Sequence, residues 1–346
     1  MARADENLAF MLQYENVAWY EDGKVKILDR RIYPVRTEYV TCKTYQEVAQ
    51  AITDMVTQSG GPYVAAGMGM ALAAHNIKGK SEKEIRDHLD KAAYALSHAR
   101  PTTSAHMVVI VDSCKKAAHA ALKNGEAIDQ AIFDHVLSIN EKRYSNIYTL
   151  AQYLVDKFPD EGTIMTQCFA ETIVGMMLKV AGERGKKIKV ICPETRPYFQ
   201  GARLTASVVC DQGYDVTVIT DNMPGYVLEK KNVDVFTSAA DVIAMDGHVV
   251  NKIGTFQIAL AAWYRKIPYY CTGTPNVHHP TIDTVTIEER DPDFVLQAMG
   301  QKTTMKGVKG YYPAFDITPP QLVSGIVTTK GIFSPYDLNR HFKAEE

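Results

Sequence analysis

The sequence predicts an α/β protein in which a small antiparallel sheet and several helices precede a doubly wound parallel sheet. Residues 13–42 contain β-type runs around Asp22-Gly23, a residue pair typical of two-residue hairpin turns. Helical patterns then continue to about residue 157. Beyond "PDEG" at residues 159–162, short β-rich runs alternate with helical runs, which is typical of βαβ units and a parallel sheet.

A chain of 346 residues is long enough for two domains. We expect an N-terminal β and helical domain over residues 1–158 and a C-terminal α/β domain over residues 159–346, divided at "PDEG". In the helical part, Thr44 with Glu47 and Ser81 with Glu84 have the spacing of capping boxes, which predicts two helix starts. In the parallel sheet, a site is expected at the carboxyl ends of the strands.

Composition excludes several classes of function. Hydrophobic residues make up 46% and charged residues 23%, and the net charge of -2 does not favour a partner nucleic acid. No apolar run is long enough to cross a membrane, and the N-terminus does not resemble a signal peptide, so we expect a cytoplasmic protein. The six cysteines are scattered without a C-x-x-C pair, which favours neither a disulfide framework nor a metal site.

Three residues of the α/β part have both a structural and a functional interpretation. Cys168 ends the β-rich run "TIMTQC" and is either a small buried thiol or an acid/base at the mouth of the sheet. Asp241 lies within one predicted strand over residues 233–247, as a structural cap or as a buried acid with a raised pKa. Lys252, with Asn251 at a predicted helix start, suits a phosphate better than a structural role.

Other motifs are weak when taken singly. Gly60-Gly61 at a helix start leave backbone N–H groups that suit an anion, and Arg100 before Pro101 suits a phosphate or lies on a solvated surface. The glycine-containing run at residues 64–75 has Leu72 where a dinucleotide fingerprint needs a small residue, so we expect helix packing there and no nucleotide cofactor.

Five motifs occur together in one order: "ARPT", "ETRPYFQGARLTA", "AADVIAMDGHVVNKIGT", "IEERDP" and "PAFDITP". From about Trp19 to about Pro335 the chain resembles the methylthioribose-1-phosphate isomerase family. That family shares its fold with ribose-1,5-bisphosphate isomerase and with regulatory subunits of the translation-initiation guanine-nucleotide exchange factor. The resemblance implies a Rossmann-like C-terminal domain without nucleotide and a homodimer. It also implies isomerisation of a pentose 1-phosphate, such as 5-methylthioribose 1-phosphate or a related 5-deoxypentose 1-phosphate, without metal or organic cofactor.

The resemblance also implies roles for particular residues. The family's active cysteine falls on Cys168 and its active aspartate on Asp241. Asp241, kept neutral by burial, would protonate the ring oxygen, and Cys168 would act as acid/base at C1 and C2. A helix N-terminus would lower the pKa of Cys168 and burial would raise it. The implied sugar and phosphate contacts are Gly60, Gly61, Arg100, Gln200, Asn251 and Lys252.

The chain departs from the family around the implied reactive end of the sugar. Ser59 stands where the family usually has an arginine, Gln167 replaces a common histidine, and Phe169 and Glu171 change the residues after the cysteine. Two alternatives therefore stay open: a non-catalytic regulatory or scaffold protein of the same fold, and an isomerase of ribose 1,5-bisphosphate. Retention of both Cys168 and Asp241 favours catalysis, because a binding protein needs neither.

Overall fold

The computed structural model describes residues 3–100 and 104–343. The chain forms two compact units, Met1–Ser145 and Asn146–Glu346, which meet inside the long helix α6 (Ile128–Val155). The sequence placed the domain boundary between residues 158 and 159, where helices give way to alternating strands and helices. That boundary stays a prediction.

A three-stranded antiparallel sheet opens the N-terminal unit, as the sequence predicted. Its order is β1 (Ala18–Glu21), β2 (Lys24–Leu28) and β3 (Tyr39–Cys42). The turn between β1 and β2 has φ values of 49° at Asp22 and 68° at Gly23. Positive φ at both central residues is the geometry that favours Asp-Gly in a hairpin, because it matches the twist of the strands.

Helices complete the N-terminal unit. They are η1 (Phe10–Leu12), α1 (Tyr14–Val17), α2 (Tyr45–Thr53), α3 (Gly61–Asn76), α4 (Glu82–Ser97) and α5 (Ser104–Asn124), together with the first part of α6. Both predicted capping boxes are present, at Thr44 for α2 and at Ser81 for α4.

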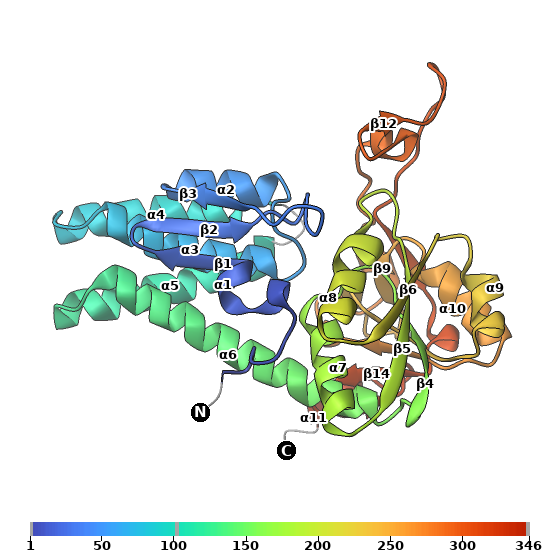
Figure 1. Cartoon of the computed structure of the whole chain (residues 1–346). Helices are drawn as coiled ribbons and strands as arrows, with labels where there is room; N and C mark the ends of the chain where they lie inside the picture. Colours follow the sequence, from blue (N-terminus) through green and yellow to red (C-terminus); the bar gives the residue numbers. More distant parts are fainter. Residues whose placement is uncertain (1–2, 101–103, 344–346) are drawn as a thin grey trace. The chain divides into compact units, whose positions relative to one another are not determined.

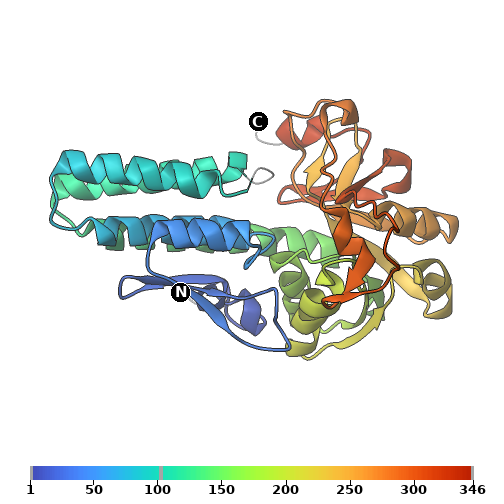
Figure 2. The same ribbon diagram turned by 90° about the horizontal axis from the view of Figure 1, so that it is seen from above.

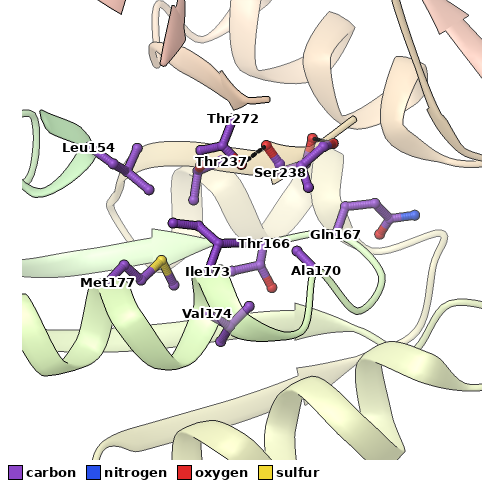
Figure 3. A pocket seen from close by; sticks show the side chains of 11 residues that line it. Leu154, Thr166, Gln167, Ala170, Ile173, Val174, Met177, Thr237, Ser238 and Thr272 are labelled. Atoms are coloured by element: carbon purple, nitrogen blue, oxygen red, sulfur yellow. Dashed lines mark hydrogen bonds between the residues drawn. The ribbon is translucent and has the colours of Figure 1, made fainter. Parts of the chain in front are cut away.

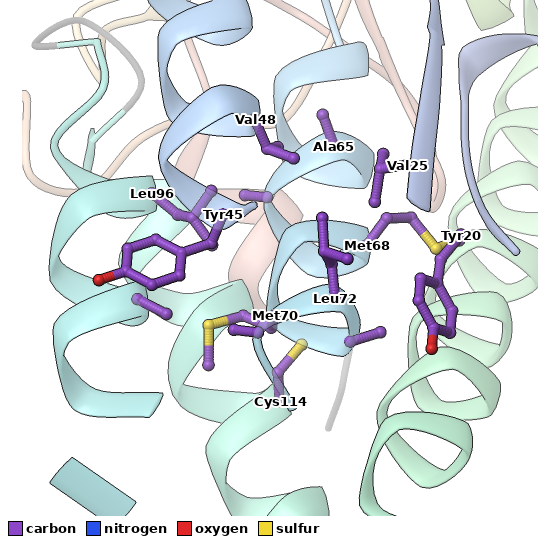
Figure 4. Close-up of a cluster of buried hydrophobic side chains, with 14 of the residues drawn as sticks. Tyr20, Val25, Tyr45, Val48, Ala65, Met68, Met70, Leu72, Leu96 and Cys114 are labelled. Carbon is purple, nitrogen blue, oxygen red and sulfur yellow. The ribbon is translucent and has the colours of Figure 1, made fainter. Parts of the chain in front are cut away.

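Helix α3 lies at the centre of the unit, with the sheet on one side and α4 and α5 on the other (Figure 2). Its side chains are buried almost all round and form the core drawn in Figure 4. A Cβ added at Gly67 would lie 2.7 Å from Val136, which confirms that the small residues of this run serve close helix packing.

The C-terminal unit contains a seven-stranded sheet in the order β15-β14-β10-β7-β4-β5-β6. All neighbouring pairs are parallel except β14 with β15. The strands are β4 (Glu161–Met165), β5 (Lys187–Pro193), β6 (Asp215–Ile219), β7 (Val233–Ala239), β10 (Tyr269–Thr272), β14 (Gly325–Thr328) and β15 (Gly331–Phe333). Chain order reverses between β4 and β7, so the sheet has the doubly wound order of a Rossmann-like domain.

Helices cover both faces of this sheet, as Figure 1 shows. On one face lie α7 (Thr172–Glu183) and α8 (Ala206–Asp211), the latter preceded by the π-helical turn η3 (Gly201–Thr205); on the other lie α9 (Pro224–Lys230) and α10 (Thr255–Tyr264). The predicted fold class is therefore confirmed. Among the described residues, no helix has the length and apolar character that a membrane span requires.

A second, antiparallel sheet follows the order β13-β9-β8, from β8 (Val242–Ile243), β9 (Val249–Lys252) and β13 (Phe315–Thr318). A projection carries the short strands β11 (Gln297–Ala298) and β12 (Gln301–Lys302) after the turn η5 (Pro292–Leu296) (Figure 1). Short helical turns η4 (Ile282–Thr284) and η6 (Pro320–Leu322) and the helix α11 (Asn339–Lys343) complete the unit.

Two sequence predictions about this sheet are wrong. Residues 233–247 form β7 and β8 with a break at Ala240-Asp241, where the chain leaves one sheet and enters the other. Asn251 and Lys252 end β9 and do not start a helix, since α10 begins only at Thr255.

Candidate active site

Cys168 and Asp241 follow two adjacent parallel strands, β4 and β7, at the point where the strand order reverses. In doubly wound sheets this position forms a crevice at the carboxyl edge, where ligands bind. The backbone N–H of Asp241 donates to the carbonyl oxygen of Val250 at 2.9 Å, so the loop after β7 is joined to β9 beside Asn251 and Lys252. The fold therefore gathers four of the predicted residues at one edge of the C-terminal unit.

The loop that carries Cys168 is also joined to the segment after β9. The side-chain amide of Gln167 donates to the carbonyl oxygen of Ile253 at 3.1 Å. Gly254, which follows, has φ of 103°, and a Cβ there would lie 2.9 Å from the Gln167 amide nitrogen. Glycine is needed at this position for both its backbone conformation and the close approach. Gln167, a departure from the family pattern, thus links the Cys168 loop to the Lys252 segment.

The backbone around Cys168 is strained. Cys168 has φ of 60° and Glu171 has φ of 51°, values that non-glycine residues rarely adopt. The hydroxyl of the fully buried Thr205 donates to the carbonyl oxygen of Cys168. Strained backbone of this kind persists only when its surroundings hold it, and it is frequent at active sites.

Desolvation by the surrounding protein raises the pKa of the Cys168 thiol to about 11. The positive charge of Lys252 and the backbone N–H of Phe169 lower this pKa but do not cancel the effect of burial. The sequence left open whether a helix N-terminus or burial would have the larger effect on this pKa. Cys168 is half-buried, and desolvation has the larger effect. At neutral pH the side chain is consequently a thiol that is able to donate a proton, not a thiolate.

Asp241 is exposed, so the sequence prediction that it is buried is wrong. The physical reason is the break between β7 and β8, which carries residues 240 and 241 out of the sheet to the surface of the chain. Its negative charge is nevertheless close enough to raise the pKa of Cys168.

Lys252 is the buried cation of the site, with 5% of its surface exposed. Its ammonium lies 4.3 Å from the centre of the Phe315 ring. Burial lowers the pKa of Lys252, while the charges of Cys168 and Asp241 raise it. Within residues 3–100 and 104–343, the ammonium makes no hydrogen bond or ion pair, so it is available to an anion.

Asn251 and Gln200 are both buried close to turns. The amide of Asn251 donates to the hydroxyl of Thr255 at 3.0 Å, at the start of α10. Gln200 precedes η3, and its side-chain oxygen has no hydrogen-bond partner in the described parts of the chain. A buried amide oxygen without a donor is costly, which is consistent with a role in binding a ligand.

The loop before Gln200 is built from the motif "ETRPYFQGA". The backbone N–H groups of Thr195 and Arg196 each donate to the carboxylate of Asp221 at 2.7 Å. A Cβ on Gly201 would lie 1.8 Å from the carbonyl oxygen of Pro193, so only glycine fits there. These contacts position Gln200 against the end of β5.

Three of the predicted contacts belong to the N-terminal unit: Gly60, Gly61 and Arg100. That they bind the same ligand as the residues of the C-terminal unit stays a prediction. Gly60 is the N-cap of α3, as expected. The N–H of Gly61, however, already donates to the carbonyl oxygen of Gln58 at 3.0 Å, so the expectation that it is open to an anion is wrong in this conformation. Arg100 is half-buried after α4, and Pro101 lies outside the described residues.

A small pocket opens beside the Cys168 loop (Figure 3). Its polar lining comes from Thr166, Gln167 and the ends of β7 and β10, where Thr272 donates to the carbonyl oxygen of Ser238 at 3.4 Å. Its apolar lining comes from α7 and the end of α6. The sequence does not predict this pocket, because the residues that line it are far apart in the chain.

Thr205, Arg290 and Tyr312 also belong to the site, and the sequence did not predict a role for them. Arg290 lies in "IEERDP" and Tyr312 directly precedes "PAFDITP", so the motifs were visible but suggested no role. The positive charge of Arg290 lowers the pKa of Cys168, which places it in the same electrostatic environment as Lys252.

Comparisons with known proteins agree with this architecture. The profile of the Initiation factor 2 subunit family matches residues 59–335. A methylthioribose-1-phosphate isomerase of Pelotomaculum thermopropionicum is 32% identical over 94% of this chain and 93% of its own length. A putative methylthioribose-1-phosphate isomerase of Methanocaldococcus jannaschii is 36% identical over 92% and 95%.

Two solved structures are similar over nearly the whole chain. The 5-methylthioribose 1-phosphate isomerase of Pyrococcus horikoshii has a TM-score of 0.83 and 27% identity, covering 97% of this chain and 98% of its own. The translation initiation factor eIF-2B subunit delta of A. fulgidus has a TM-score of 0.81 and 30% identity, covering 96% and 99%.

The strand order and the polar groups at its reversal point define a Rossmann-like α/β protein with a candidate site at the carboxyl edge of the sheet. The chain belongs to the Initiation factor 2 subunit family. Its resemblance to methylthioribose-1-phosphate isomerases, which the motifs indicated, is confirmed by the similarity to those relatives.

Proposed function

We propose that this protein is an aldose–ketose isomerase that converts a pentose 1-phosphate to the corresponding ketose 1-phosphate. The observation that carries the proposal is the juxtaposition of Cys168 and Asp241 after adjacent strands, with the charges of Asp241 and Lys252 both acting on the thiol. Relatives named methylthioribose-1-phosphate isomerase support 5-methylthioribose 1-phosphate, or a related 5-deoxypentose 1-phosphate, as the substrate.

The chemistry begins with opening of the furanose ring. The anomeric oxygen carries the phosphate, so the ring cannot open by loss of a hydroxyl proton. Asp241 would give its proton to the ring oxygen as the bond from that oxygen to C1 breaks. Because Asp241 is exposed in this chain, its carboxyl must become covered by the bound substrate for its pKa to rise toward neutrality.

A hydrogen then moves from C2 to C1, leaving a ketone at C2 and a CH₂ group that bears the phosphate. In a proton-transfer route, the Asp241 carboxylate removes the C2 proton and the neutral Cys168 thiol donates its proton to C1. The C2 hydroxyl then returns a proton to the Cys168 thiolate as the C2 carbonyl forms. In a hydride route, hydrogen passes directly from C2 to C1 as the C2 hydroxyl loses its proton to the Asp241 carboxylate. The raised pKa of Cys168 favours donation by the thiol in the first route.

The sugar and phosphate contacts are proposed at Lys252, Asn251, Gln200, Gly60, Gly61 and Arg100. Lys252 is the strongest of these proposals, because a buried ammonium without a hydrogen-bond acceptor in the described parts of the chain gains most from an anion. We further propose that the protein is cytoplasmic and forms a homodimer. Light scattering of the purified protein would test the dimer, because it measures the molar mass in solution.

Turnover in D₂O tests the function and the route together. Methylthioribose, 5-deoxyribose and ribose 1-phosphates, with ribose 1,5-bisphosphate, would be incubated with the protein and followed by NMR. Ketose formation from a pentose 1-phosphate is expected, and deuterium at C1 would indicate proton transfer whereas its absence would indicate a hydride shift. Cys168→Ser and Asp241→Asn should each reduce kcat by roughly 100-fold or more with an unchanged circular dichroism spectrum.

The second candidate is a regulatory protein of the same fold, which the similarity to the eIF-2B delta subunit favours. The same assay distinguishes the two. Lack of turnover of every sugar phosphate in the panel would reject the isomerase and leave the regulatory candidate. Wild-type rates in both variants would instead reject the assigned roles of Cys168 and Asp241.

A further inference from the structure

Two cationic side chains of the C-terminal unit, Lys252 and Arg290, both lie close to the ring of Phe315. The Lys252 ammonium lies 4.3 Å and the Arg290 guanidinium carbon 5.6 Å from the centre of the Phe315 ring. The two positive charges repel each other, since Arg290 lowers the pKa of Lys252. A neighbouring anion would relieve this repulsion. The sequence did not predict a role for Arg290.

Arg290 is held so that part of its guanidinium stays available. Its Nε and Nη2 donate to the carboxylate of Glu288 at 2.7 and 3.4 Å, and its side chain is 13% exposed. The guanidinium also interacts with the Tyr312 hydroxyl and lowers the pKa of that phenol, so the two groups lie side by side. A guanidinium paired on one edge presents its other edge to an oxygen of a phosphate or carboxylate.

Tyr312 adds a neutral donor at the same place. It is 3% exposed, and the neighbour that acts on its hydroxyl is the Arg290 guanidinium, which is able only to donate. The proton of the Tyr312 hydroxyl therefore has no acceptor in the described chain, and a buried phenol in that state points to a group absent from the protein itself. Burial raises the pKa of Tyr312 to about 12, while Arg290 opposes this effect, so the hydroxyl keeps its proton and is able to donate it.

A two-stranded ribbon places these two side chains together. The N–H of Arg290 donates to the carbonyl oxygen of Tyr312 at 2.9 Å, and Glu289 pairs with Pro313 in an antiparallel bridge. Residues that pair directly across such a ribbon have their side chains on the same face, and alternate residues face the opposite way. Tyr311 accordingly lies on the other face, where it is 69% exposed and donates to Glu289.

We propose that Arg290 and Tyr312 form an anion subsite beside Lys252 that binds the phosphate of the sugar substrate. Lys252 neutralises one phosphate oxygen, and Arg290 Nη1 and the Tyr312 hydroxyl donate to others. That the ligand is a sugar phosphate rests on the proposed function. That the ligand is an anion rests only on the residues of the subsite.

Three variants test the subsite: Arg290→Lys, Tyr312→Phe and, as matched control, Tyr311→Phe. Binding of inorganic phosphate and of D-ribose 1-phosphate would be measured by titration calorimetry at low salt. Arg290→Lys and Tyr312→Phe are each expected to weaken both ligands by roughly tenfold, as loss of a charge-assisted hydrogen bond does. Tyr311→Phe should bind like wild type, and binding of D-ribose without phosphate should not differ among the proteins.

Kinetics separate a binding role from a structural one. With an active substrate from the NMR panel, the two subsite variants should raise KM with a smaller change in kcat, whereas a disturbed fold would lower kcat and the melting temperature together. Subsite variants that bind phosphate as tightly as Tyr311→Phe would overturn the proposal, as would a wild-type protein that binds neither phosphate ligand. Phosphate binding that depends on Arg290 in a protein without turnover would keep the subsite and reject only the isomerase function.

Discussion

The hydroxyl of Thr205 donates a hydrogen bond to the main-chain carbonyl of Cys168, joining the turn after β5 to the loop after β4. Cys168 itself has the left-handed backbone conformation, with φ of 60°. This contact orients the peptide that follows the cysteine, whose N–H, at Phe169, lowers the pKa of the thiol. The reactive candidate is thus held by a residue 37 positions away in sequence.

Replacing Thr205 tests this support. Thr205→Val keeps the shape of the side chain but removes the donor, leaving a strained carbonyl without its partner. We expect kcat for the isomerase reaction to fall roughly tenfold, because the thiol loses its orientation. Thr205→Ser keeps the hydroxyl and should retain most of the activity. Equal rates for the two variants would show that the hydrogen bond does not position Cys168.

Cysteine alkylation tests the protonation state of Cys168. A pKa of about 11 means that the reactive thiolate is rare at pH 7 and increases roughly tenfold with each pH unit up to that value. Iodoacetamide labelling, followed by peptide mass spectrometry, should therefore accelerate steadily from pH 7 to pH 10 at this residue. The exposed Cys210 should be labelled much faster at pH 7. Labelling of Cys168 that already levels off near neutral pH would contradict the raised pKa.

The raised pKa of Asp316 predicts how the stability of the folded chain depends on pH. It accepts the N–H groups of Gly254 and Phe256 at the start of α10, and burial raises its pKa from 3.8 to about 6. The folded chain therefore holds this proton more tightly than the unfolded chain. The contribution of Asp316 to the free energy of unfolding is highest below about pH 4, falls as the pH rises to about 6, and is then constant.

Urea unfolding at pH 4.5, 5.5 and 6.5 would measure this effect. Asp316→Asn cannot titrate, so its stability relative to wild type should improve by on the order of 2 kcal/mol across that range. Other groups titrate equally in both proteins and cancel in the difference. A difference that does not change with pH would mean that Asp316 has an ordinary pKa in the folded chain.

Replacing glycine by alanine is expected to change stability in opposite directions at Gly201 and Gly225. A Cβ at Gly201 would lie 1.8 Å from the Pro193 carbonyl oxygen, so Gly201→Ala requires a backbone shift in the turn that carries Gln200. We expect a loss of stability of about 2 kcal/mol or more. Gly225 lies in α9 with nothing near its Cβ position, and Gly225→Ala should stabilise by about 0.5–1 kcal/mol. Thermal unfolding of the two variants beside wild type checks both signs.

Local sequence was enough to predict the elements of this fold. Asp22-Gly23 predicted the hairpin and the Thr44 and Ser81 boxes predicted two helix starts, because each depends on backbone conformation or hydrogen bonds within a few residues. The alternation of strands and helices after residue 158 predicted the parallel sheet, since βαβ units are formed by consecutive elements. Motif order likewise identified the family.

Only the tertiary structure decided how the candidate site is arranged. The exposure of Asp241 depends on the chain leaving one sheet for another, and the thiol pKa of Cys168 depends on burial by distant residues. The pairing of Arg290 with Tyr312 joins segments 22 residues apart, and Thr205 reaches the Cys168 loop from another strand–helix turn. Burial, charge and strain arise from these long-range contacts, which are absent from any short stretch of sequence and exist only once the sheets have assembled.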